Sequence, residues 1–149
     1  MPYTTRAEVE KRIPAQLVLD LVDDDATGTF DATNEARFDE CEQTASEEID
    51  SYLQVVYAVP ISPTPGIISP IAVDLTTYYL HWRRAHQFGM PDDIVEAYKM
   101  RIKQLERISS GKQKLGQTTE SPASENTLAV SDGPAQMFTG GPTGTLRDF

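Results

Sequence analysis

Hydrophobic residues recur at helical spacing along most of the first 116 positions of this chain. The longest such stripe lies between positions 33 and 56, where apolar residues stand three and four apart, as in a helix with one buried face. We predict a helix from Thr33 or Asn34 to Val56, about 35 Å long at 1.5 Å per residue. The stripe consists of Phe38, Cys41, Ala45, Ile49, Tyr52, Leu53 and Val56.

Two more long helices are predicted downstream. The segment 60–66, PISPTPG, contains three prolines and a glycine, so it predicts an ordered, extended connection instead of a helix. A second apolar stripe then predicts a helix over Ile67–His86, with Pro70 tolerated in its first turn. A third stripe, which includes Tyr98 and Leu105, predicts a helix from Asp92 or Asp93 to Ser109.

The N-terminal segment predicts shorter helices. Thr5 and Glu8 have the spacing of a capping box, which opens a helix over Thr5–Arg12 that Pro14 ends. A second apolar patch follows at Leu17, Val18, Leu21 and Val22. The pattern as a whole predicts an all-α fold, a small bundle of three main helices plus one or two short N-terminal helices.

The composition changes after position 116. Residues 117–149 are rich in Ser, Thr, Gly and Pro, so we divide the chain into a helical domain, 1–116, and an extended C-terminal tail, 117–149. A tail that only solvates itself has no use for aromatic residues. We therefore predict that the tail orders on assembly and binds a partner through its apolar residues, which are Met137, Phe138, Leu146 and Phe149.

Overall composition excludes several classes of protein. The net charge of -10 argues against ordinary nucleic-acid binding, which needs Lys and Arg at each phosphate contact. Repulsion from DNA is nevertheless useful where DNA must pass without sticking. The single cysteine excludes an intrachain disulfide. Because the chain shows neither a signal peptide nor a membrane-length apolar run, we expect a soluble protein made in a cytoplasm.

The charges are unevenly distributed along the chain. Between Asp20 and Asp50 there are twelve acidic residues and one arginine, whereas between Arg83 and Lys114 there are eight basic and four acidic residues. Two interpretations remain open. Acidic and basic faces of adjacent copies pair, or the two segments are solvated helix faces of opposite sign.

The turn DDDATGTFD, 23–31, resembles most of a calcium-binding loop. Oxygen-bearing side chains alternate, and Gly28 stands where such a loop reverses direction. However, Asn34 occupies the position of the closing glutamate. The alternative is that the aspartates cap the neighbouring helices and hold a tight turn. The candidate Ca²⁺ ligands are Asp23, Asp25, Thr27 and Asp31.

Other polar residues give no coherent catalytic set. Asp74 lies within an apolar helix and is either a general base or, as the pattern favours, the buried partner of a Lys, an Arg or a Tyr hydroxyl. The sequence HWRR, 81–84, is either a nucleic-acid patch or a helix end with interface residues. Neither a phosphate-binding loop nor a nucleophile motif occurs. We therefore expect that the protein is not an enzyme.

With the elements in this order, the chain resembles the Mu-like phage and prophage neck proteins that join head to tail. Four stretches carry the resemblance, and together they cover nearly the whole chain. Two departures are Thr77, where that family often has Arg, and an acidic turn that is further from a full calcium loop. The four stretches are DDDATGTFD (23–31), EIDSYLQVVYAVPISPTP (48–65), IAVDLTTYYLHWRR (71–84) and MFTGGPTGTLRDF (137–149).

The resemblance implies a structural neck adaptor, also called a head completion connector, located in the virion. Such a protein forms a homo-oligomeric ring, of twelve copies, beneath the portal protein. It also contacts a downstream stopper or tail-completion protein, while DNA passes through the channel without specific binding. A stopper position is a neighbouring possibility, although stoppers tend to be β-rich. The alternative function is a calcium-responsive helical binding module, whose melting temperature would shift with calcium.

Overall fold

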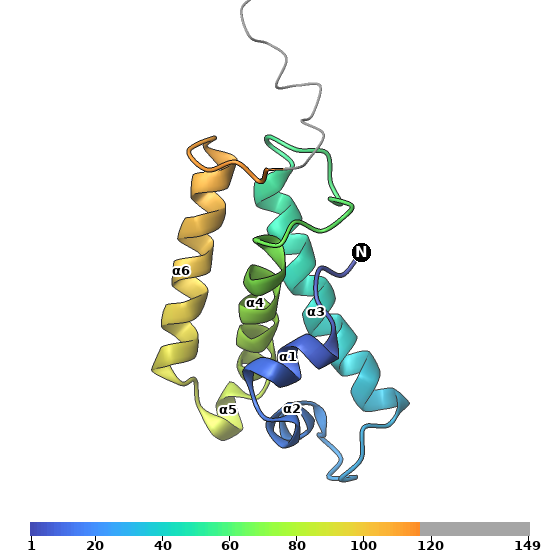
Figure 1. Cartoon of the computed structure of the whole chain (residues 1–149). Coiled ribbons are helices and arrows are strands. Elements are labelled where there is room, and N and C mark those ends of the chain that lie inside the picture. Colours follow the sequence, from blue (N-terminus) through green and yellow to red (C-terminus); the bar gives the residue numbers. More distant parts are fainter. Residues whose placement is uncertain (117–149) are drawn as a thin grey trace, which may run out of the picture.

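The computed structural model describes residues 1–116, which form six helices joined by loops (Figure 1). The predicted all-α fold is therefore confirmed. The four tail residues predicted to bind a partner lie outside the described residues. In chain order the helices are α1 (Arg6–Arg12), α2 (Ala15–Val22), α3 (Ala32–Leu53), α4 (Ile68–Arg83), α5 (Ala85–Phe88) and α6 (Asp92–Ser109).

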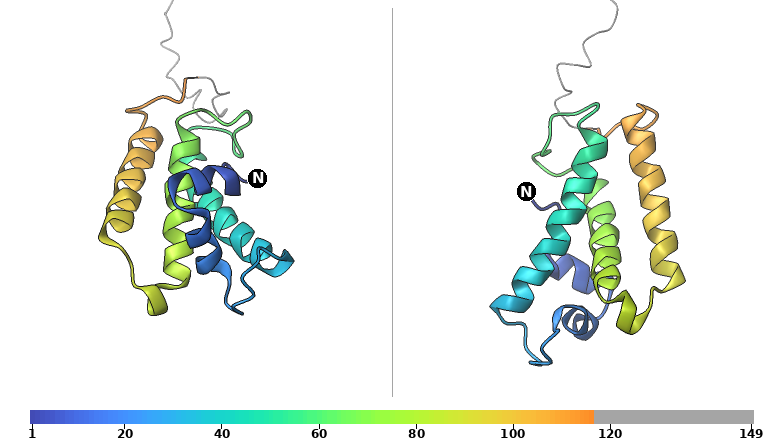
Figure 2. Two further views of the ribbon diagram at one scale, coloured as in Figure 1. Left: turned by 60° about the horizontal axis from the view of Figure 1, so that its bottom comes forward. Right: turned by 180° about the vertical axis from the view of Figure 1, so that it is seen from behind.

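Helix α4 lies at the centre of the body and packs against α3, α6, α1 and α2 (Figures 1 and 2). It is buried on nearly every side because apolar or small residues occupy most of its positions. Two apolar clusters form the core. One joins α3, α4 and α6 around Ile49, Leu75 and Leu105. The other joins α1, α2, α3 and α4 around Val18, Phe38 and Leu80.

Most predicted helices are present, with changed ends. The capping box is formed, but Thr5 lies before α1 as its N-cap. Helix α3 ends at Leu53, short of Val56. The reason is that the carbonyl of Leu53 accepts hydrogen bonds from the backbone N–H groups of both Val56 and Tyr57, in a turn that buries the Tyr57 ring.

The predicted helix Ile67–His86 is divided into α4 and the four-residue α5. Arg84 leaves the helical conformation between them, with φ -112° and ψ 16°. Its side chain and that of Arg83 both hydrogen-bond to Asp24, which lies beyond α2. The sequence pattern missed this break because the partner is far away along the chain. Helix α6 begins and ends as predicted.

Tyrosine hydroxyls attach the irregular segments to the bundle. The hydroxyl of Tyr3 donates to Asp50 on α3 and accepts from the backbone N–H of Ile61 at 2.9 Å. The hydroxyl of Tyr57 accepts from the backbone N–H of Leu115 at 3.2 Å. The proline-rich connection is therefore ordered, as predicted, and the described chain ends beside it at the top of Figure 1.

Candidate functional site

The acidic turn between α2 and α3 is held by its own hydrogen bonds. The Asp23 carboxylate accepts from the backbone N–H groups of Thr27 at 3.0 Å and of Gly28 at 2.7 Å. These bonds lower the pKa of Asp23 to about 2. Gly28 has a φ of +69°, which L side chains rarely adopt. Asp31 caps α3 by accepting from the backbone N–H of Asn34 at 2.9 Å.

The other aspartates of this turn form ion pairs. Asp24 accepts from Arg83 and Arg84, and Arg37 lies 3.5 Å from it. Hydrogen bonding to Arg83 is the main reason that the pKa of Asp24 is lowered. Asp25 pairs with Arg37 at 3.0 Å. This cluster of one turn and three guanidinium groups joins the loop after α2 to α3 and to the end of α4.

The four candidate calcium ligands therefore lie on one turn, with their oxygens engaged in local bonds. Asp23 and Asp31 accept from backbone N–H groups, Asp25 pairs with Arg37, and the Thr27 hydroxyl contacts Asp23 at 3.1 Å. Over residues 1–116, no group of three or more His, Cys, Asp or Glu side chains is arranged to hold a metal ion. Calcium binding stays a prediction, while the hydrogen bonds give these side chains capping and turn-forming roles.

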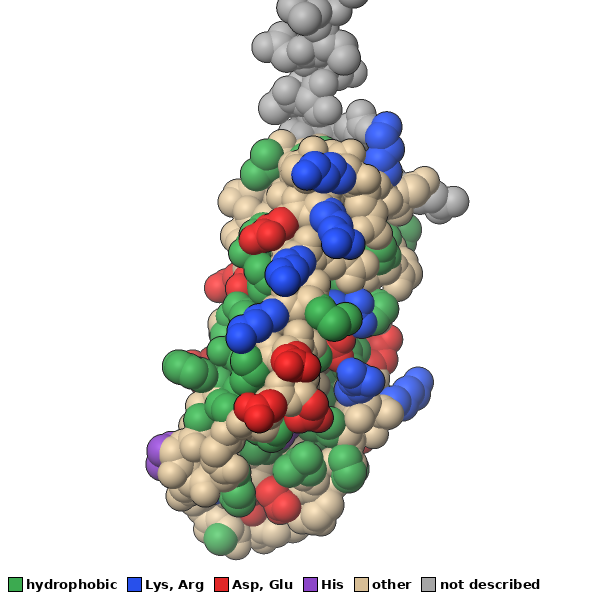
Figure 3. Space-filling view, turned by 90° about the vertical axis from the view of Figure 1, so that its left-hand side faces the viewer, with side chains coloured by type: hydrophobic (Ala, Val, Ile, Leu, Met, Phe, Trp, Pro, Cys, Tyr) green, Lys and Arg blue, Asp and Glu red, His purple; other side chains and the backbone are tan. Residues whose placement is uncertain are grey.

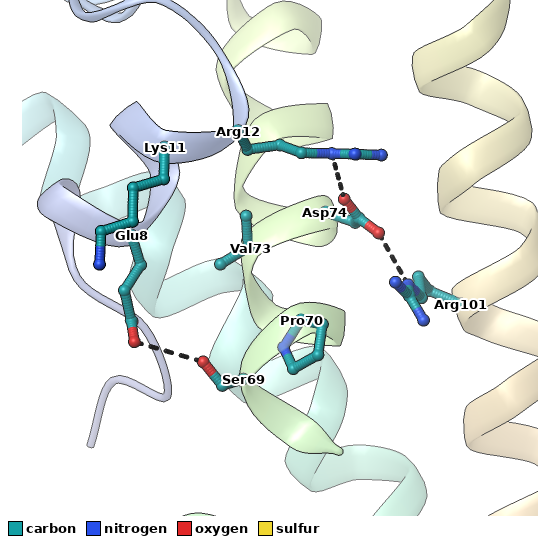
Figure 4. Close-up of a pocket in the computed structure, with 8 residues that line it drawn as sticks. All are labelled: Glu8, Lys11, Arg12, Ser69, Pro70, Val73, Asp74 and Arg101. Atoms are coloured by element: carbon teal, nitrogen blue, oxygen red, sulfur yellow. Dashed lines mark hydrogen bonds and ion pairs between the residues drawn. The ribbon is translucent and has the colours of Figure 1, made fainter. Parts of the chain in front are cut away.

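Asp74 links three helices. Its carboxylate is almost fully buried on α4, with 6% of the residue exposed. Its two oxygens accept from Nε of Arg12 on α1 at 3.1 Å and from Nε of Arg101 on α6 at 2.7 Å (Figure 4). The bridge borders a hollow of about 330 Å³. The buried-partner interpretation of Asp74 therefore has direct geometric support. The lining of the hollow is Glu8, Lys11, Arg12, Ser69, Pro70, Val73, Asp74 and Arg101.

Glu48 on α3 makes a second bridge. Its two carboxylate oxygens accept from the hydroxyls of Tyr79 on α4 and Tyr98 on α6, each at 2.7 Å. Burial, and then the bond to Glu48, raises the pKa of both hydroxyls well above its usual value. Glu48 was not singled out in the sequence analysis. No local signal marked it, because its partners are 31 and 50 residues away.

An aromatic stack continues from this bridge to the surface. The Tyr98 ring lies 4.0 Å from the Tyr78 ring, which in turn stacks 6.2 Å from Trp82. Trp82 is 61% exposed. The remaining residues of HWRR are engaged, since His81 is buried and both arginines bind Asp24. This arrangement favours the interface interpretation of HWRR over a basic nucleic-acid patch.

Exposed charge differs between the long helices, since α6 carries both signs whereas α3 carries only acids. The exposed acids of α6 are Asp92, Asp93, Glu96 and Glu106. Figure 3 shows the face that includes α6, where Lys and Arg side chains follow one another along the upper part and acidic side chains gather below. The exposed basic residues of α6 are Lys99, Lys103 and Arg107. On α3 the exposed charged residues are all acidic, namely Glu35, Asp39, Glu40 and Glu47.

Glu42 is a buried acid whose charge is poorly stabilised. Its residue is 7% exposed, and burial, together with nearby Asp39 and Glu8, raises its pKa to about 7. A raised pKa in the folded state means that the native protein binds the proton more tightly than the unfolded chain does. The stability that this proton contributes is therefore present below about pH 4.5 and is lost as the pH rises towards about 7.

We expect Glu42→Gln to increase the free energy of unfolding by about 1–2 kcal/mol at pH 8 and to have little effect at pH 4.5. The reason is that glutamine keeps the shape of the protonated acid and never ionises. Urea unfolding at both pH values measures the difference. The exposed neighbour Gln43→Glu serves as the control for an added surface charge. An equal effect of Glu42→Gln at both pH values would contradict the assignment.

Comparisons with known proteins agree with the resemblance to Mu-like phage and prophage proteins. The family described as Bacteriophage Mu, Gp36 matches residues 3–131. The Mu-like prophage FluMu protein gp36 of Haemophilus influenzae is 31% identical over 83 residues, which are 56% of this chain and 55% of that protein. The match thus spans about half the length of this relative. Within residues 1–116, no helix has the length and apolar character needed to cross a membrane. Because the family match extends over most of the sequence, this chain belongs to the bacteriophage Mu gp36 family and is a Mu-like phage protein.

Proposed function

We propose that this protein is a structural neck component of a phage particle, a head-tail adaptor that forms a ring beneath the portal and joins the DNA-filled head to the tail. The observation that carries the proposal is the run of exposed basic residues on the C-terminal part of α6, together with the exposed acids of α3, in a chain of the Mu gp36 family. A protein with two different, complementary faces joins copies of itself head to tail, and such contacts close into a ring when the rotation between copies allows it.

The partners follow from this position in the particle. The ring, proposed to contain twelve copies, binds the portal protein on one side and a stopper or tail-completion protein on the other. DNA passes through its channel without specific binding, because the net charge of -10 repels phosphates and lets the DNA slide. The protein is made in the host cytoplasm and functions at the neck of the virion. Exposed Trp82 is a suitable anchor for a protein partner, since large aromatic residues dominate many interfaces.

The location is tested with an epitope-tagged chain expressed in the phage-producing cell. We expect affinity capture from the lysate to recover portal-bearing heads or whole virions, with gold label at the neck in electron micrographs. The same tag on a major tail protein is the control for label position. Recovery with an unrelated cellular partner, or virions without the tagged chain, would contradict the proposed function.

Deletion of residues 117–149 is expected to lower the yield of infectious particles by at least about a hundredfold, because a head that cannot retain its connector receives no tail. A plaque assay on cells that supply only the truncated chain measures the effect. The fourfold alanine variant of Met137, Phe138, Leu146 and Phe149 is the matched test of the apolar anchors, and it keeps the tail length. Normal plaque numbers from either variant would refute the predicted role of the tail.

A further inference from the structure

The C-terminal part of helix α6 presents three exposed basic residues, on a face whose first turns carry exposed Asp92 and Glu96. Lys99, Lys103 and Arg107 are four residues apart, so they share one face of the helix and span about 12 Å. All three are exposed, and none forms an ion pair with another residue of the segment 1–116. Met100, 67% exposed, lies among them. We call Lys99, Lys103 and Arg107 the basic stripe.

Helix α3 presents the complementary charge. Glu40 and Glu47 are seven residues apart, which places them on the same face about 10 Å from each other. Both are exposed, and neither is part of an ion pair in the described portion of the chain. Thr44 lies exposed between them. We call Glu40 and Glu47 the acidic stripe. Its length matches that of the basic stripe to within the reach of a Lys side chain.

The two stripes of one copy do not meet. Helices α3 and α6 pack against α4 and against each other, and Glu48 and Tyr98 occupy the inner side of that contact. The residues of both stripes are exposed to solvent, and Figure 1 shows α6 at the left edge of the body and α3 descending towards the right edge. The basic stripe and the acidic stripe can therefore form ion pairs only between two different copies of the chain.

We propose that the basic stripe of one copy contacts the acidic stripe of the next copy, with Met100 facing the region of Thr44. The proposal rests on the proposed function, since it assigns the faces by which neighbouring copies in the ring meet. The contact is heterologous, so a copy that uses its α6 face still offers its α3 face, and the chain of contacts ends only when a ring closes. Two single helix faces bury less area than the roughly 1,200 Å² of a stable complex. Each contact is therefore weak alone and is reinforced when many form together.

Charge reversal gives a test with an internal rescue. The acidic variant carries Lys99→Glu and Lys103→Glu, and the basic variant carries Glu40→Lys and Glu47→Lys. In either variant alone, like charges face each other. In an equal mixture, the reversed α6 face of the acidic variant meets the reversed α3 face of the basic variant, while the two unaltered faces also match. Copies of the two variants that alternate therefore restore every contact. Such recovery is expected if the basic stripe contacts the acidic stripe.

Disulfide trapping detects contacts that are too weak to isolate. Met100→Cys and Thr44→Cys are introduced together into the full-length chain and into both charge variants. The native Cys41 does not interfere, because burial raises the pKa of its thiol to about 11. Mild oxidation at low salt is followed by a non-reducing gel. A chain with Lys11→Cys and Thr44→Cys is the control, since Lys11 is exposed on α1, on another face. Circular dichroism melting verifies that every variant is folded.

We expect a ladder of oligomers from the parent cysteine chain, at least about a tenfold lower yield from either charge variant alone, and recovery of the ladder from their mixture. Absence of a ladder in the parent, an undiminished ladder in a single charge variant, or a mixture that fails to recover would each overturn the proposal. These outcomes are separate from those for the proposed function. If gold label is found at the neck but trapping does not depend on the stripes, the proposed adaptor function stands and the proposed contact faces are refuted. If trapping depends on the stripes but no label is found at the neck, the contact faces stand and the adaptor function is refuted.

Discussion

Replacement of Asp74 by alanine is expected to lower the free energy of unfolding by about 2–3 kcal/mol. The carboxylate is 6% exposed and receives both the Arg12 and the Arg101 side chains, so its removal leaves two guanidinium groups without their shared partner. The Arg12 side chain is 57% exposed and the Arg101 side chain 27%. Both can recover part of their hydration, which places the expected loss at the lower end for buried ion pairs.

Chemical denaturation monitored by circular dichroism measures this effect. The control is Asp74→Asn, which keeps the size of the side chain and removes its charge. We expect it to lose most of the same stability, since the amide accepts from one arginine and presents an N–H donor to the other. A double-mutant cycle with Arg101→Met isolates the contact between α4 and α6. A change below about 0.5 kcal/mol for Asp74→Ala would show that the bridge is a surface pair without consequence.

Glu48→Ala is expected to cost about 2–3 kcal/mol of unfolding free energy, because two hydrogen bonds to a charged acceptor are lost together. The hydroxyls of Tyr79 and Tyr98 both donate to this carboxylate at 2.7 Å, and both lie in partly buried surroundings. Without Glu48, these donors face the apolar seam between α3, α4 and α6. The loss also frees Tyr98, on which Tyr78 and then Trp82 are stacked.

The adjacent residue offers a matched control. Glu47 is exposed, so Glu47→Ala is expected to change stability by less than about 0.5 kcal/mol. Tyrosine ionisation gives a readout that a general packing defect does not. In Glu48→Gln, the pKa values of Tyr79 and Tyr98 are expected to fall, since a nearby negative charge no longer opposes their ionisation. Unchanged titration of tyrosine absorbance at alkaline pH would contradict the bridge.

The two carboxylates also fix the positions of the charged outer faces. Asp74 and Glu48 both reach α6, one through Arg101 and the other through Tyr98. The orientation of α6 about its own axis determines where its basic stripe points. We therefore infer that loss of either carboxylate weakens trapping between copies, even though neither residue belongs to a stripe.

The sequence alone determined the helices and much of their chemistry. Apolar spacing located α3, α4 and α6, since a helix that buries one face must repeat its apolar residues every three to four positions. Thr5 with Glu8 marked the start of α1 through contacts within one turn, and the acidic Asp92 marked the start of α6. The order of the motifs also identified the phage family. Each of these signals is local, or is a sum of local signals, and needs no knowledge of the tertiary packing.

Only the tertiary structure decided which residues the helices bring together. Asp74 was predicted to have a buried partner, but its two arginines stand 62 and 27 residues away. Nothing in the sequence distinguished Glu48 from the exposed Glu47 beside it. The break after Arg83 likewise depends on Asp24, some 59 residues earlier. Periodicity determines which face of a helix is buried, whereas the rotation and crossing of packed helices determine which side chains meet, because these depend on the fit of the whole core.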